Sequence, residues 1–156
     1  MENRLKMVAR VVFLMVFVTG SAFAAGNNAV TYEKGIKKII SANCLSCHGN
    51  DAPTMKEFKK DKNKYKKAMK GPRMNTYVNL MVMVNGSDTG ALMRRLDDGK
   101  NTAKGKPGNM YGYLGGTDEE KAKNLEVIKK WIGGWTLKRK KDISADERKA
   151  IKALEK

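Results

Sequence analysis

The sequence contains very few residues of the kinds that form disulfide bonds or bind metals. Among 156 residues it has two cysteines and one histidine. Disulfide bonds in exported proteins usually close long loops, whereas a bridge between Cys44 and Cys47 would close a very short loop and stabilise the fold little. A disulfide scaffold is therefore a poor explanation for these two cysteines.

Carboxylates are also scarce relative to basic residues. The chain has 16 Asp and Glu against 32 Lys and Arg, which gives a formal net charge of +16. Without residues 1–24, which hold three basic residues and one Glu, the charge is still about +14. Such an excess indicates anionic partners, and the candidates are acidic proteins, an anionic membrane surface and nucleic acid.

The sequence lacks an apolar run long enough to cross a bilayer. The longest run, at 11–23, has about 13 residues, against the roughly 20 that a spanning helix needs. Basic residues precede it, and it ends in the small-x-small pattern Ala22-Phe23-Ala24. We therefore predict a signal peptide at 1–24, cleaved after Ala24, and a periplasmic or otherwise exported protein. Export argues against nucleic acid as a partner.

All the cysteine and histidine of the chain lies in one pentapeptide, Cys44-Leu45-Ser46-Cys47-His48. Cys-x-x-Cys-His is the attachment pattern of c-type haem, in which two thiols add to the porphyrin vinyl groups and the histidine binds the iron. A thioredoxin-like redox pair would need a βαβ setting, and the chain has no strand-rich pattern. An inert disulfide beside a surface histidine is the other alternative. The motif predicts one covalent haem c.

Since no other histidine exists, a second haem and bis-histidine ligation are both excluded. The sixth iron ligand must then be Met, Lys, another weak donor, water or nothing. Most methionines fill hydrophobic cores, and Met81 and Met93 occupy apolar helical faces. Beyond residue 24 the chain has seven methionines: Met55, Met69, Met74, Met81, Met83, Met93 and Met110.

The rest of the chain predicts an all-α protein with long loops. Apolar spacings of three and four favour helices at 32–43, 77–84 and 89–96. Thr117 and Ser144 each begin a capping box, which predicts a long helix and then a short terminal one. The Gly-rich segment 97–116 is a long loop, and such loops are often functional. We expect a single domain at 25–136, followed by a basic linker and C-terminal helix at 137–156.

These features together resemble a class I, mitochondrial-type cytochrome c over about residues 31–135. An amphipathic helix with Gly35 leads into the haem motif, and a Gly-rich loop with a Met precedes the last long helix. The resemblance implies crossed N- and C-terminal helices, with Gly35 near Ile128 or Trp131. It also implies that the Pro53 carbonyl accepts a hydrogen bond from the ligand imidazole.

The resemblance further implies that His48 is the proximal iron ligand and that a Met from the late loop is the distal one. Met110 lies seven residues before Thr117, where the family's Met ligand usually occurs. The Pro that often follows that Met is replaced here by Tyr111. Met74 and Met83 are the alternatives.

We expect a monomeric one-electron carrier, not an enzyme, with acidic redox protein partners. An anionic membrane surface is a further candidate partner. The alternative is a haem-based sensor or catalytic haem with an open sixth position, which would bind carbon monoxide quickly when reduced. A third hypothesis is a tethering module that uses the basic runs at 56–70 and 138–141.

Overall fold

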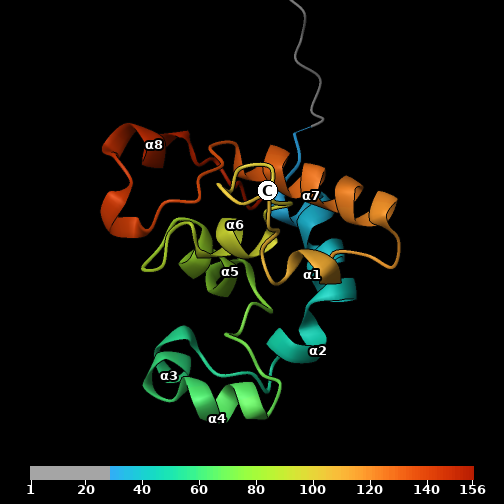
Figure 1. Cartoon of the computed structure of the whole chain (residues 1–156), viewed down its shortest axis with the longest axis vertical. Coiled ribbons are helices and arrows are strands. Elements are labelled where there is room, and N and C mark those ends of the chain that lie inside the picture. The colour runs from blue at the N-terminus through green and yellow to red at the C-terminus, as the bar shows by residue number, and fades with distance from the viewer. Residues whose placement is uncertain (1–28) are drawn as a thin grey trace, which may run out of the picture.

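The computed structural model describes residues 29–156, so the predicted signal peptide lies outside the described residues (Figure 1). Within them the chain is helical, and its one extended pairing is an isolated bridge between Gly133 and Ile151. The prediction of an all-α protein is confirmed. The elements are η1 (Tyr32–Ile36), α1 (Lys37–Asn43), α2 (Leu45–His48), α3 (Met55–Lys60), α4 (Lys62–Lys67), α5 (Tyr77–Val84), α6 (Ala91–Leu96), η2 (Tyr111–Tyr113), α7 (Asp118–Ile132), η3 (Lys140–Asp142) and α8 (Ala145–Ala150).

The helix predicted at 32–43 is interrupted near its start. Lys34 and Gly35 leave helical geometry, and Gly35 has a φ of +149°, which L side chains rarely adopt. A Cβ at Gly35 would lie 3.9 Å from Cγ1 of Val127 on α7. Gly35 therefore faces the C-terminal helix as predicted, although its neighbour there is Val127 rather than Ile128 or Trp131.

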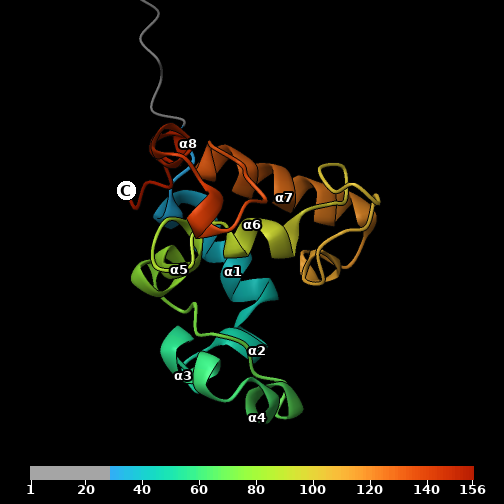
Figure 2. The same cartoon turned by 60° about the vertical axis from the view of Figure 1, so that its left-hand side comes forward.

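The core lies between α7 and the elements η1, α1, α5 and α6 (Figure 2). Thr117 caps α7 with the predicted capping box, in which Glu120 also bonds back to the Thr117 amide. The inward face of α7 carries Leu125, Ile128, Trp131 and Ile132, all buried. Helices α3 and α4 lie at the end of the molecule opposite α8, and both figures show them below α2.

The C-terminal segment corrects the predicted boundary at residue 136. The main chain of 151–155 packs against the core, with Ile151 5% exposed and Ala153 fully buried. The Leu154 carbonyl accepts hydrogen bonds from the Tyr32 amide at 2.9 Å and from Trp131 Nε1 at 2.8 Å. The tail thus belongs to the same folded unit as η1 and α7. The polar composition of the tail did not predict this packing, because many of the hydrogen bonds that hold the tail to the core use backbone groups.

In the part of the chain that the structure describes, no helix has the length and apolar character needed to cross a membrane.

Candidate haem-binding site

One helical turn brings the three residues of the haem motif together. Cys44 ends α1, and its amide donates to the Ile40 carbonyl at 2.9 Å. The Cys44 carbonyl in turn accepts from the amides of Cys47 at 3.2 Å and His48 at 3.0 Å. Both cysteine side chains are half-buried, and they form no disulfide with each other. The predicted attachment residues therefore lie on a single turn at the end of α1.

The imidazole of His48 is fixed by a carbonyl from a distant segment. Its Nδ1 lies 2.6 Å from the Pro72 carbonyl oxygen. Because a carbonyl can only accept, Nδ1 carries the hydrogen, and the lone pair of Nε2 is left available to a metal. Burial lowers the pKa of His48, although the bond to Pro72 acts in the opposite direction. The ring is thus held in the neutral form that binds iron.

This contact replaces the one predicted for Pro53. The Pro53 carbonyl accepts from the Arg73 amide at 2.7 Å, and so it is already engaged by the backbone of a neighbouring segment. That segment runs alongside the motif, since the Gly71 amide donates to the Cys47 carbonyl at 3.0 Å. The predicted role of Pro53 is therefore wrong in this structure, and Pro72 fills it.

Gly71 is a second residue that sequence reasoning missed. A Cβ at this position would overlap the ring of His48, because the Gly71 backbone lies directly against the imidazole. A Gly-Pro pair such as Gly71-Pro72 is a sequence signal for a turn or loop. Its role could not be inferred from spacing, because the pair lies more than 20 residues after the histidine that it contacts.

Cys44 suits covalent attachment better than a redox function. Burial raises the pKa of Cys44 to about 11, so this residue is a neutral thiol at physiological pH. A reactive redox cysteine instead needs a depressed pKa and a stabilised thiolate. Burial disfavours the charged thiolate that a redox cysteine needs. A thioether has no ionisable group, so it can be buried without that electrostatic cost. The donor set of two thiols and one oriented imidazole fits a c-type haem.

The candidate distal ligands occupy different surroundings. Met74 is buried, and its amide donates to the His48 carbonyl at 2.9 Å. Met83 is buried within the core on α5. The sulfur of the buried Met93 accepts from the Thr136 amide at 3.2 Å. Met110 is half-buried in the loop before η2 and packs against the core, as Cys44 also does.

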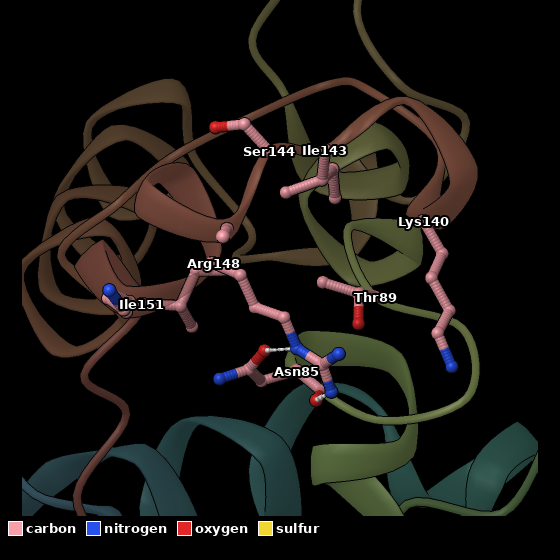
Figure 3. A pocket seen from close by; sticks show the side chains of 9 residues that line it. Asn85, Thr89, Lys140, Ile143, Ser144, Arg148 and Ile151 are labelled. Atoms are coloured by element: carbon pink, nitrogen blue, oxygen red, sulfur yellow. Dashed lines mark hydrogen bonds between the residues drawn. The ribbon is translucent and has the colours of Figure 1, made fainter.

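A cavity of about 550 Å³ lies elsewhere, between α8 and the turn that joins α5 to α6 (Figure 3). Its wall includes Arg148, whose guanidinium donates to the side chain and carbonyl of Asn85. Cys44, Cys47 and His48 do not line it. This cavity is therefore distinct from the haem-binding site.

Comparison with known proteins gives two matches. A family model described as PccH cytochrome c matches residues 31–155. The structure of the monohaem cytochrome PccH from Geobacter sulfurreducens is 49% identical in sequence, with a TM-score of 0.75. That match covers 80% of this chain and 98% of the other. A comparison with curated proteins gave no match.

Proposed function

Because this chain belongs to the PccH cytochrome c family, we propose that it is an exported one-electron carrier whose haem iron is bound by His48 and Met110. The family establishes an all-α monohaem c-type cytochrome with one covalently bound haem c, a protein type that transfers electrons. Export is supported by the signal-peptide pattern of the first 24 residues.

The hydrogen bond between His48 and Pro72 carries the proposal for the proximal ligand. It presents Nε2 as the free nitrogen, and it increases the electron donation of the imidazole toward a bound metal. Gly71 leaves room for the ring at the same point. When bound, haem c supplies an iron that gains and loses one electron. The surrounding residues keep the ligand oriented and partly shielded from water.

Position favours Met110 as the distal ligand. The Met74 amide donates to the His48 carbonyl, so the backbone of Met74 is tied to the residue proposed as the proximal ligand. The sulfur of Met93 is occupied by a hydrogen bond. Met110 instead lies in a loop, half-buried beside the core. A neutral thioether favours the reduced iron and raises the reduction potential.

The test compares single Met→Ala variants of the ferric holoprotein. Met110→Ala should keep the haem attached, remove the sulfur-to-iron charge-transfer band and lower the reduction potential. Met74→Ala and Met83→Ala are matched controls that should retain the band. Loss of the band in a control, with retention in Met110→Ala, would reverse the assignment. Rapid carbon monoxide binding by the reduced wild-type protein would instead favour a sensor or catalytic haem.

We also propose that the partner is an acidic redox protein that docks on the exposed helices α3 and α4. Residues 56–70 contain eight lysines but only two acids, Glu57 and Asp61. Among the described residues, two of these lysines form ion pairs, Lys59 with Asp88 and Lys70 with Asp51. We call the eight the lysine face: Lys56, Lys59, Lys60, Lys62, Lys64, Lys66, Lys67 and Lys70.

The lysine face adjoins the haem-binding site. Lys70 Nζ donates to the carbonyl of Ser46, which lies between the two motif cysteines. Brief electron-transfer complexes have small interfaces and depend on long-range attraction for their association rate. A partner attracted to this face would therefore approach the chain close to the haem attachment point.

Two triple variants of equal charge change test this docking surface. Changing Lys64, Lys66 and Lys67 to Gln should slow association with an acidic redox protein at low salt. Changing residues 139–141 to Gln removes the same charge from the tail and should slow association less. Equal slowing by both variants, or wild-type rates that do not fall as salt rises past ~0.1 M, would contradict the proposal.

A further inference from the structure

Asp97 is a buried carboxylate that the haem-binding site does not use. It follows the last residue of α6 and is fully buried. Its Oδ1 accepts from the Gly99 amide at 2.9 Å. Its Oδ2 accepts from Asn101 Nδ2 at 2.8 Å and from Trp135 Nε1 at 3.0 Å. Two donors from the loop that follows Asp97 and one from the segment after α7 therefore converge on one charged group.

The backbone of Asp97 also closes the loop that leads to Met110. The Gly108 amide donates to the Asp97 carbonyl at 2.7 Å, so the loop returns to the point where it began. Two residues later, the Met110 amide donates to the Arg95 carbonyl at 2.9 Å. A Cβ at Gly108 would overlap the carbonyls of α6, so the approach is close. The position of Met110 is thus set by the base of this loop.

Trp135 connects the same base to the end of α7. Trp135 lies three residues after α7, and its indole N–H donates to the Asp97 carboxylate. Lys129 Nζ lies 5.3 Å from the centroid of the Trp135 ring. The next residue, Thr136, donates its amide to the Met93 sulfur on α6. The carboxylate of Asp97 consequently joins the end of α6, the Met110 loop and the end of α7.

We propose that Asp97 is a positioning residue that holds the Met110 loop in place for binding the iron. This inference rests on the proposed ligation by Met110. Buried hydrogen bonds to a charged acceptor are strong, and losing the acceptor leaves the donors unpaired in a dry environment. Asp97→Asn would present an amide N–H₂ to groups that are themselves donors, so all three bonds cannot be kept. The loop base would then loosen, and Met110 would be displaced more easily.

Imidazole competition measures this displacement in the ferric holoprotein. Exogenous imidazole can bind the iron only when the protein ligand moves away, so its apparent Kd reports how firmly the loop holds Met110. Asp97→Asn should lower that Kd at least fivefold. Trp135→Phe, which removes one donor and keeps the carboxylate, should lower it by a smaller factor and provides a second variant should Asp97→Asn not fold.

Asp146→Asn is the matched control, because it removes the same charge from a residue on α8 whose side chain is 94% exposed and pairs only loosely with Lys149, at 3.6 Å. Its imidazole Kd should stay within twofold of the wild-type value. If Asp97→Asn and Trp135→Phe lower thermal stability but leave that Kd within twofold, Asp97 is only structural and the proposal is overturned. Met110→Ala separates the two hypotheses, since retention of the charge-transfer band there would refute the ligand assignment itself.

Discussion

Substitution of Ile151 tests whether the C-terminal tail is part of the hydrophobic core or only attached to it. Its side chain is 5% exposed and belongs to the core cluster that contains Trp131 and Ile132. Ile151→Ala removes three carbon atoms, and each buried methylene is worth about 0.8 kcal/mol. With the cavity left behind, the free energy of unfolding should fall by about 2–4 kcal/mol. That is a large share of the ~5–15 kcal/mol that stabilises a typical domain.

The assay is guanidinium unfolding of the holoprotein, followed by tryptophan fluorescence and by the haem absorbance. Both probes should shift to a lower midpoint together, because Trp131 and the tail share hydrogen bonds. Leu154→Ala is the control, since that side chain is 51% exposed and should change stability by less than about 0.5 kcal/mol. An Ile151→Ala midpoint equal to that of the control would refute the view that the tail is integral to the fold.

Three further outcomes are expected. Tyr77→Phe removes the bond from the Tyr77 hydroxyl to the Ala153 carbonyl and should cost about 0.5–1.5 kcal/mol in denaturant unfolding. Gly71→Ala should displace His48 and change the low-spin haem spectrum, whereas Gly112→Ala, at an open position, should leave it unchanged. Burial acts to raise the pKa of Asp97, but the hydrogen bonds from Asn101 and Trp135 outweigh burial, and the pKa is lowered. The ionised Asp97 therefore stabilises the fold above its unfolded-state pKa of ~3.9. This stabilisation is lost as the pH falls from that value through the lower pKa of the folded state. Acid unfolding of Asp97→Asn should show a weaker pH dependence there, and an unchanged slope would contradict this role.

Local sequence signals predicted much of the fold. Both capping boxes, at Thr117 and Ser144, form as expected, because a cap depends on residues three apart in the chain. Helix α5 has the predicted limits, Tyr77–Val84, since its apolar spacing reflects the face that it buries. The haem motif was equally local, since its two cysteines and its histidine occupy one turn.

What the sequence could not provide were contacts between distant backbone groups. The Pro72 carbonyl reaches His48 across 24 positions, whereas the resemblance to class I cytochromes implied this contact for Pro53. The tail was assigned to a separate segment for a similar reason. The tail accepts its hydrogen bonds from Tyr32 and Trp131 through a main-chain carbonyl, and such bonds cannot be predicted from composition or from apolar periodicity.

The pairing of the tail with η1 determines how the molecule could be held on a surface. Since the Tyr32 and Glu33 amides donate to the carbonyls of Leu154 and Glu155, both ends of the described fold leave from one pole. Helices α3 and α4 occupy the other pole (Figures 1 and 2). An affinity tag, electrode linker or fusion partner attached at either end would therefore present the lysine face outward. Immobilisation through these ends offers a way to orient the protein without covering its proposed docking surface.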